Sequence, residues 1–270
     1  MAEKVRGTLV IVGGHEDKDG SCDILREVVR LAGAREARLL VLTTATELGL
    51  EAGSDYRRLF LGLGAAKVDA LHLDTREAAN RPQAREVMER ATGIFFTGGD
   101  QLRITSTLGG TVAYQALHRC YENGVIIAGT SAGASAMSST MIVGGAEDDS
   151  PSRGSVSMAP GMGLLNEVVV DQHFAQRGRI GRLLSAVAQN PHILGLGIDE
   201  DTAVVVAADG SLSVIGSQTV TVVDGHGMDH SNATEASPRQ ALALFNVVLH
   251  VLAAGYRYDL VSRKPLARRA

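Results

Sequence analysis

The chain has 270 residues, of which 45% are hydrophobic and 21% are charged, enough for one large α/β core or two small ones. Its formal net charge is -4 and its sequence pI is about 6.1, which excludes the strongly basic surface that binding to nucleic acid or to an anionic membrane requires. Residues Met1 to Arg6 contain no apolar signal core and no apolar run is long enough to span a bilayer, so we expect a cytoplasmic protein.

Five short apolar runs in the first half of the chain predict strands that are buried on both faces. They are Thr8–Val12, Arg38–Leu42, Asp69–Leu73, Gly93–Thr97 and Val125–Ala128. Amphipathic segments lie between them, among them Ile24–Ala32 and Arg81–Ala91, the second of which has Pro82 in its first turn. This alternation predicts an α/β fold, a three-layer sandwich with a mostly parallel central sheet.

The character of the sequence changes after Met137. Residues Gly144 to Gly163 are rich in Gly, Ser, Pro and Asp, which predicts a long loop or a loosely paired hairpin at the rim of a site. Beyond this segment, Glu167–Asp171 and Ile193–Ile198 predict two strands, and the segment from about Arg179 to Gln189 predicts a helix between them.

The C-terminal part of the chain predicts a β-rich portion that closes with a helix. Ala203–Ala207 and Ser211–Ile215 flank an Asp209-Gly210 turn and predict a hairpin, and Thr219–Asp224 predicts one more strand. The apolar segment Pro238–Ala253 predicts the final helix. We expect a solvated basic tail after it, with the cations Arg257, Arg263, Lys264, Arg268 and Arg269. Since no repeat or linker interrupts the pattern, we expect residues 1–270 to form a single domain.

The two cysteines, Cys22 and Cys120, lie in segments with a helical pattern and form no C-x-x-C pair. Isolated thiols of this kind are typical of a protein in a reducing compartment. We therefore expect neither of them to be a metal ligand or a nucleophile.

The most informative motif is Gly129-Thr130-Ser131-Ala132-Gly133, which follows an apolar run and precedes a segment of small residues. A G-x-S-x-G pattern between a strand and a helix forces the serine into a strained turn and lifts its hydroxyl above the edge of the sheet. Small residues are needed on either side, because bulky side chains would collide with the adjacent strand or helix. Ser131 is therefore the candidate nucleophile.

A serine nucleophile needs a base and a third group that orients the base. Ligand-binding and catalytic groups of open α/β sheets gather beyond the carboxyl ends of the strands. His173 directly follows a predicted strand, in Asp171-Gln172-His173-Phe174, and Glu200 follows the next predicted strand. We expect His173 to lie on the same edge as Ser131, with serine, histidine and carboxylate in that chain order on three strand ends.

An oxyanion hole needs two backbone N–H donors beside the nucleophile. The predicted strand that contains Phe96 runs into Thr97-Gly98-Gly99-Asp100-Gln101, and the glycines let the backbone approach a bound carbonyl. We expect the N–H groups of Gly99 and Ala132 to bind the oxyanion. A tight turn between a strand and a helix is the alternative interpretation of the two glycines, and both interpretations are compatible.

Three arginines follow His173 closely, in Arg177-Gly178-Arg179-Ile180-Gly181-Arg182. Each guanidinium presents a planar fork of donors that matches a carboxylate. A solvated helix face is the alternative interpretation of such a cluster. The position directly after His173 favours a pocket for an acidic substrate.

Four motifs together resemble those of the cyanophycinases. They are Gly98-Gly99-Asp100-Gln101, Gly129–Ala134, Asp171–Phe174 with the arginines that follow, and Gly197–Ala203. The resemblance covers nearly the whole chain and implies a class I glutamine amidotransferase-like fold, in a serine peptidase family that also includes the aspartyl dipeptidases. It further implies an exopeptidase, typically a homodimer, that needs no metal or other cofactor. The implied substrate is cyanophycin, a poly-aspartate with arginine on each β-carboxyl, and the implied product is the β-Asp-Arg dipeptide.

The same resemblance implies roles for individual residues. Ser131 would be the nucleophile, His173 the general base and acid, and Glu200 the group that orients His173. The substrate site would be lined by Gln101, Asp171, Gln172, Arg177, Arg179 and Arg182. The arginines would bind the terminal α-carboxylate of the substrate. Its guanidinium would meet acidic groups such as Asp171, Glu147, Asp148 or Asp149.

Other functions compete with this interpretation. An aspartyl dipeptidase would share the motif around Ser131 and would act on free dipeptides. A glutamine amidotransferase would need a cysteine at that position, and a non-catalytic binding protein would not need the serine, histidine and carboxylate set. Val12-Gly13-Gly14-His15 lacks the full glycine fingerprint of a nucleotide site, and His15-Glu16-Asp17 has no partner ligands at a spacing that predicts a metal site.

Overall fold

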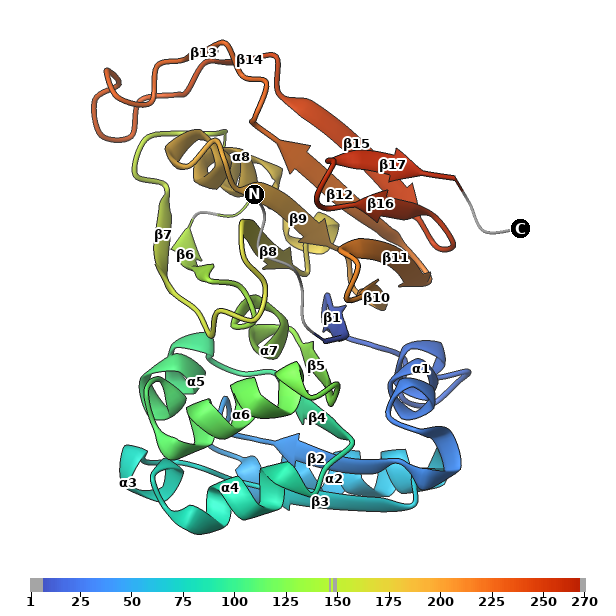
Figure 1. Ribbon diagram of the computed structural model, residues 1–270. Helices are drawn as coiled ribbons and strands as arrows, with labels where there is room; N and C mark the ends of the chain where they lie inside the picture. Colours follow the sequence, from blue (N-terminus) through green and yellow to red (C-terminus); the bar gives the residue numbers. More distant parts are fainter. Residues whose placement is uncertain (1–6, 146, 148–149, 268–270) are drawn as a thin grey trace.

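A computed structural model of the chain describes residues 7–145, 147 and 150–267, and its largest sheet has nine strands in the order β17-β16-β11-β10-β1-β5-β4-β2-β3 (Figure 1). Neighbouring strands run parallel from β1 to β3. This half contains β1 (Leu9–Val12), β5 (Ile126–Thr130), β4 (Gly93–Phe96), β2 (Arg38–Leu42) and β3 (Lys67–Leu71). The expected α/β fold with parallel central strands is confirmed. β3 departs from the expected two-sided burial because it lies at the edge of the sheet, and in β2 the first residue, Arg38, is exposed.

The other half of this sheet is antiparallel and comes from the C-terminal part of the chain. It contains β10 (Thr202–Val206), β11 (Ser211–Gly216), β16 (Arg257–Asp259) and β17 (Lys264–Leu266). β1 pairs with β5 on one side and with β10 on the other, so it joins the two halves.

The expectation of a solvated basic tail is wrong where the structure describes the tail. Arg257 and Lys264 lie in strands that extend the nine-stranded sheet, and Arg263 Nη1 lies 2.7 Å from Asp224 Oδ1. The backbone of this segment completes the edge of β11, which is why it is not free in solvent. Arg268 and Arg269 lie outside the described residues, as does the N-terminal segment from Met1 to Arg6.

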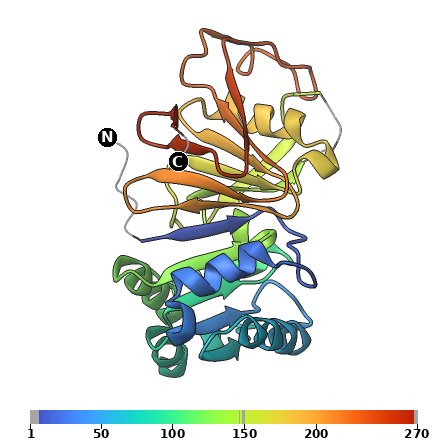
Figure 2. The same cartoon turned by 90° about the vertical axis from the view of Figure 1, so that its right-hand side faces the viewer.

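Helices cover both faces of the parallel half. In β1, Val10 and Val12 belong to the apolar cluster on one face, and Leu9 and Ile11 belong to the cluster on the other. The first face carries α1 (Asp23–Leu31), η1 (Ala34–Glu36) and α2 (Gly49–Gly62), and the second carries α3 (Arg76–Ala79), α4 (Pro82–Glu89), α5 (Gln101–Leu108) and α6 (Val112–Glu122). Figure 2 shows α1, in blue, lying across the strands. Each fully buried aliphatic side chain contributes about 1.5–3 kcal/mol, so burial on both faces stabilises these strands.

A second sheet of four strands lies beside the antiparallel half, in the order β15-β12-β9-β8 (Figure 1). Its elements are β8 (Val168–Gln172), α8 (Ile180–Gln189), β9 (Leu194–Ile198), β12 (Thr219–Asp224) and β15 (Val248–Ala253). On one face, Val170 shares an apolar cluster with Val204 of β10. On the other face, Val169 packs with Leu183 of α8. The four-stranded sheet therefore lies between α8 and the nine-stranded sheet.

The predicted closing helix Pro238–Ala253 is wrong. Val248–Ala253 forms β15, which pairs antiparallel with β12 along its whole length. Before it, β13 (His230–Ser231) and β14 (Leu244–Phe245) form a short ladder, and Asn246 has a φ of 61°, which interrupts a helix. The apolar residues fit either pattern locally, and the edge of β12 decides for the strand because its backbone groups need partners.

Residues 140–160 form a hairpin of β6 (Thr140–Gly145) and β7 (Val156–Pro160), with a register shift between Ile142 and Gly144. Of the two structures predicted for Gly144 to Gly163, the hairpin is the one observed. Glu147 lies at its tip, while Asp148 and Asp149 are outside the described residues. The remaining short helices are α7 (Ala132–Ser135) and η2 (Ala175–Arg177). In the described part of the chain, no helix combines the length and the apolar character that crossing a membrane requires.

Candidate active site

Ser131 occupies a sharp turn between β5 and α7. Its φ of 52° is unusual for a residue other than glycine, and this conformation costs about 1–3 kcal/mol. A Cβ on Gly129 would lie 2.7 Å from the carbonyl oxygen of Gly133, and one on Gly133 would lie 2.6 Å from that of Phe96. Both positions therefore need glycine for the turn to form. The Ser131 N–H donates to the Val12 carbonyl at 3.0 Å, which fixes the turn to β1.

His173 follows β8, and its Nε2 lies 3.0 Å from Ser131 Oγ. The sequence predicted His173 and Ser131 on the same edge of one sheet. The structure corrects this prediction, because β8 belongs to the four-stranded sheet and β5 to the nine-stranded sheet. The loop after β1 connects the two sheets, since the His173 N–H donates to the Gly13 carbonyl at 2.8 Å. Gly14 lies against the ring: a Cβ there would be 2.3 Å from His173 Cε1.

Glu200 lies between β9 and β10, where the chain passes from the second sheet to the first. Its Oε1 lies 2.6 Å from His173 Nδ1. The two neighbouring acids have other partners. Asp199 accepts hydrogen bonds from the Ala175 N–H and the Thr219 hydroxyl, and Asp201 accepts one from the Asp17 N–H. Of these three acids, Glu200 is the one that contacts the imidazole.

The electrostatics of His173 favour a neutral imidazole at neutral pH. Burial lowers its pKa below the ordinary value, the hydrogen bond with Glu200 raises it, and the charges of Arg177 and His15 lower it, with a net lowering. Since an ionised carboxylate can only accept, the proton of the neutral ring is assigned to Nδ1. The lone pair of Nε2 then faces Ser131 Oγ, the arrangement that general-base catalysis uses.

The Gly98-Gly99 turn lies beside Ser131. A Cβ on Gly98 would be 3.5 Å from Ser131 Cβ, and one on Gly99, whose φ is 141°, would be 2.2 Å from the Ala45 carbonyl oxygen. Within the described ranges, neither the Gly99 N–H nor the Ala132 N–H donates to a backbone carbonyl. The turn before Asp100 thus approaches Ser131 through Gly98, and both N–H groups expected from the sequence lack a backbone acceptor.

Asp171, Gln172, Arg179 and Arg182 form an internal network instead of a row of free charges. Arg182 Nε lies 2.9 Å from Asp171 Oδ2, and its Nη2 contacts the other carboxylate oxygen. Arg179 Nη1 donates to the Gln172 carbonyl at 2.6 Å and to its side-chain oxygen at 3.2 Å, and Nη2 contacts Glu147 Oε1 at 2.6 Å. Asp171 is 1% exposed, Arg179 4% and Arg182 8%, so these groups are paired inside the protein.

Arg177 and Gln101 have different surroundings. The Arg177 side chain is 46% exposed, with Nη1 3.6 Å from Glu147 Oε1, and it lines the cleft beside Ser131. Gln101, the first residue of α5, donates from Nε2 to the Ile142 carbonyl at 2.9 Å and so ties α5 to β6. Of the three predicted arginines, Arg177 is the one with an exposed guanidinium.

A cleft of about 600 Å³ opens beside Ser131. Its lining includes His15, Asp17, Lys18, Thr46, Thr97, Gly98, Thr130, Ser131, His173 and Arg177. It therefore brings together the ends of β1, β4 and β5 and the loop after β8, as the rule for the carboxyl ends of parallel strands predicts.

Glu16 is a residue of the site that sequence reasoning missed. It is 4% exposed, accepts a hydrogen bond from Thr130 Oγ1 at 2.6 Å, and also accepts one from the Tyr56 hydroxyl. Burial raises the pKa of Tyr56, which keeps it a donor. Because Thr130 directly precedes Ser131, Glu16 anchors the turn. The sequence does place this carboxylate shortly after Gly13-Gly14, at the end of a predicted strand, which could have indicated a role in the site. The sequence analysis considered it only as a possible metal ligand.

His15, His173 and Glu200 each place one possible metal-ligand atom within 4.8 Å of the others. The rings of His15 and His173 meet edge to face, with centroids 5.4 Å apart. Both ring nitrogens of His173 already have partners in Ser131 and Glu200. A metal ion at this position would have to displace one of those contacts.

Comparisons with known proteins find a family model, curated relatives and a solved structure that are similar to this chain. Residues 9–214 match peptidase family S51. The chain is 40% identical over 265 residues to a cyanophycinase of Trichormus variabilis, covering 98% of this chain and 89% of that one, and 38% identical over 268 residues to a cyanophycinase of Geminocystis herdmanii, covering 99% and 98%. The crystal structure of a peptidase from an acI-B1 Actinobacterium has the same fold, with a TM-score of 0.70 at 22% identity over 95% of this chain and 99% of that chain.

Proposed function

Since this chain belongs to peptidase family S51 and is a hydrolase, we propose that it is a serine-type exopeptidase that degrades cyanophycin and releases β-Asp-Arg dipeptides. Relatives named cyanophycinase at 38% and 40% identity over nearly the full chain support the substrate. The observation that carries the proposed chemistry is the chain of contacts from Ser131 Oγ through His173 to Glu200, at 3.0 Å and 2.6 Å.

In the proposed reaction, Ser131 Oγ attacks the carbonyl carbon of an α-peptide bond in the aspartate backbone while His173 Nε2 takes the hydroxyl proton. Glu200 holds the ring and stabilises the imidazolium that forms. The N–H groups of Gly99 and Ala132 bind the oxyanion of the tetrahedral intermediate. His173 then gives its proton to the leaving amine, and water, activated by the same imidazole, hydrolyses the acyl-enzyme and restores Ser131.

The substrate-binding residues divide into two proposed groups. Arg177, with its exposed guanidinium in the cleft, is proposed to bind a substrate carboxylate. Asp171, Gln172, Arg179 and Arg182 are proposed to hold the loop that carries His173, since they pair with one another at the end of β8 and the start of α8. Gln101 is proposed to fix the β6–β7 hairpin against the site.

We further propose a class I glutamine amidotransferase-like fold in a single domain, supported by β1, which pairs with both the N-terminal and the C-terminal strands. A cytoplasmic location is supported by the free, buried thiols of Cys22 and Cys120. A homodimer is supported by the apolar edge strand β15, where Val248, Leu249 and Val251 are 46%, 49% and 60% exposed. Light scattering on Val251→Lys, which should give a monomer, tests the dimer.

The proposed function is tested by incubating the purified protein with insoluble cyanophycin and identifying the soluble products by mass spectrometry. Wild type should clear the suspension and release β-Asp-Arg, and Ser131→Ala should not. Hydrolysis of aspartyl dipeptides without release from the polymer would instead assign the chain to the aspartyl dipeptidases of the same family. Release of β-Asp-Arg by Ser131→Ala at the wild-type rate would contradict the assignment of the nucleophile.

A further inference from the structure

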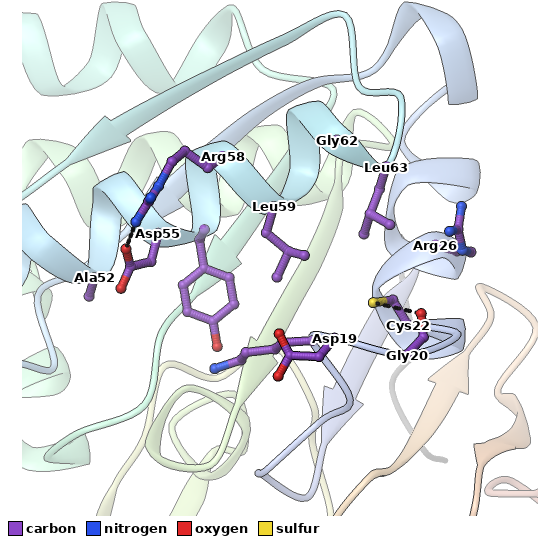
Figure 3. A pocket seen from close by; sticks show the side chains of 12 residues that line it. Asp19, Gly20, Cys22, Arg26, Ala52, Asp55, Arg58, Leu59, Gly62 and Leu63 are labelled. Atoms are coloured by element: carbon purple, nitrogen blue, oxygen red, sulfur yellow. Dashed lines mark hydrogen bonds and ion pairs between the residues drawn. The ribbon is translucent and has the colours of Figure 1, made fainter.

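A second pocket, of about 820 Å³, lies between α2 and the segment from Lys18 to Arg26 (Figure 3). Figure 3 shows Leu59 of α2, and Leu63 directly after it, pointing toward the segment that carries Asp19 and Cys22. The residues that this pocket shares with the cleft at Ser131 are Lys18, Asp19, Ala52 and Tyr56. Because the two hollows share these four lining residues, the second pocket continues the cleft along α2.

The second pocket presents charges of both signs over an apolar floor. Its cations are Lys18, Arg26 and Arg58, its anions are Asp19 and Asp55, and its apolar lining includes Ala52, Leu59 and Leu63. Arg58 Nη2 lies 2.5 Å from Asp55 Oδ1, but their side chains are 78% and 57% exposed. An ion pair this exposed contributes little to stability. Asp55 and Arg58 can therefore separate and bind the charges of a ligand instead at little cost in free energy.

The loop that carries Lys18 and Asp19 is held in place by Asp17. The Asp17 carboxylate accepts the N–H groups of Asp19, Gly20 and Cys22 at 3.1, 2.8 and 2.9 Å, and these bonds lower its pKa to about 2. The Asp17 N–H in turn donates at 2.8 Å to Asp201, the residue after Glu200. The wall between the two hollows is therefore fixed relative to the triad, as a preorganised binding surface requires.

A polymer with a repeating zwitterionic unit matches this pocket. Each unit of the proposed substrate carries one guanidinium and one free carboxylate on an aliphatic arm. Carboxylates such as Asp19 and Asp55 fit the guanidinium, Arg26 and Arg58 fit the carboxylate, and Leu59 and Leu63 fit the arm. An exopeptidase also needs a surface for the units that remain attached to the one being released.

We propose that the pocket formed by α2 and residues 18–26 binds the dipeptide units of cyanophycin that lie beyond the two units flanking the scissile bond, so that it selects the polymer over short substrates. This inference rests on the proposed function. It assigns the pocket a role in affinity for the polymer and none in bond cleavage.

The test compares the polymer with the two-unit fragment of β-Asp-Arg, which contains only the two units that flank the scissile bond. The variant Asp55→Asn with Arg58→Gln removes the two charges that α2 contributes to the second pocket and leaves the net charge unchanged. The matched control is Glu77→Gln with Arg81→Gln, which removes an equally exposed pair, 83% and 62% exposed, from the helices on the other face of the sheet. Steady-state kcat/KM is measured for each protein on both substrates.

We expect the Asp55 and Arg58 variant to lose about threefold to tenfold in kcat/KM on the polymer, while its value on the two-unit fragment and both values of the control variant stay at wild type. A second variant, Arg26→Gln, changes a residue that lines the second pocket and not the cleft at Ser131, and it should show the same selective loss. When Ser131→Ala is added to this variant to prevent cleavage, its binding to sedimented polymer should weaken by a similar factor. Equal kcat/KM of the α2 variant and wild type on the polymer, or an equal loss on both substrates, would overturn the inference and leave the proposed function standing. Failure of wild type to cleave either substrate would overturn the proposed function itself.

Discussion

The segment from Asp171 to Arg182 contributes to two polar clusters with opposite character. Around His173, each ring nitrogen has one partner, Ser131 or Glu200, and the ring borders an open cleft. Around Asp171, both carboxylate oxygens are occupied by the guanidinium of Arg182, and both side chains are more than nine-tenths buried. The first cluster keeps a proton acceptor available to a ligand, while the second satisfies its charges internally. Neighbouring residues of one motif thus serve chemistry and stability separately.

The largest expected effect of breaking this division is on catalysis. His173→Ala should lower kcat on cyanophycin by about 10⁴-fold or more, because the serine loses its base, and should change the free energy of unfolding little. Mass spectrometry of released dipeptide and urea unfolding measure the two effects. The matched control is His118→Ala, which removes a half-buried histidine whose Nε2 contacts the Met162 carbonyl at 2.9 Å, away from the cleft, and should retain activity. A kcat for His173→Ala within tenfold of wild type would remove the histidine from the mechanism.

The second cluster should respond in the opposite way. Asp171→Ala should lower the free energy of unfolding by about 3–5 kcal/mol, because Arg182 would stay buried without its partner. Asp171→Leu with Arg182→Met, which removes both charges, should recover most of that loss. Urea unfolding compares the three proteins. If the single variant kept its stability and lost its activity, Asp171 would act on the substrate and the division between the clusters would fail.

Gly14 tests how closely the histidine must approach the serine. Gly14→Ala should lower kcat/KM by about 100-fold, because a Cβ only 2.3 Å from His173 Cε1 must push the ring away from Ser131. Gly64→Ala is the matched control: its φ of 97° is close to the 100° of Gly14, and a Cβ there has nothing within 4 Å. Both variants should lose about 1 kcal/mol of stability from backbone strain, and Gly14→Ala alone should lose activity. Equal activity of the two variants would show that the ring tolerates displacement.

The parts of the fold that the sequence predicted are those set by local patterns. The apolar run before Ser131 and the glycines on either side of it specify a strand and a tight turn, because only small residues fit against Phe96 and Met137. The apolar runs of β1 and β2 specify buried strands for the same local reason.

The parts that sequence reasoning missed depend on distant partners. The segment Val248–Ala253 is a strand because β12 offers an edge, and β8 lies in a second sheet because α8 covers its outer face. The sequence likewise does not predict the pairing of Arg182 with Asp171, because it does not distinguish this arginine from the two before it. The sequence predicts which charged groups could reach a site. The tertiary structure determines which of these groups are buried and paired with one another.

The smallest expected effect concerns Arg177, which lies near both clusters. Its positive charge lowers the pKa of His173, so removing the charge should raise that pKa. A base with a raised pKa stays protonated to higher pH, and the acidic limb of the kcat profile should therefore move to higher pH in Arg177→Met. Arg177→Lys keeps the charge and loses the planar fork, so it should weaken substrate binding with the acidic limb in place.

The two Arg177 variants separate two roles of one guanidinium. Profiles of kcat against pH, measured at saturating cyanophycin, report the proton on His173 in the substrate complex, while KM reports binding. A shift in Arg177→Met alone means that the cation acts on the imidazole through its charge. Equal shifts in both variants would mean that the geometry of the fork, and through it the position of the His173 loop, sets the basicity of the histidine. In that case the cluster around His173 would depend on the same packing that holds the cluster around Asp171, and substitutions could not separate the two.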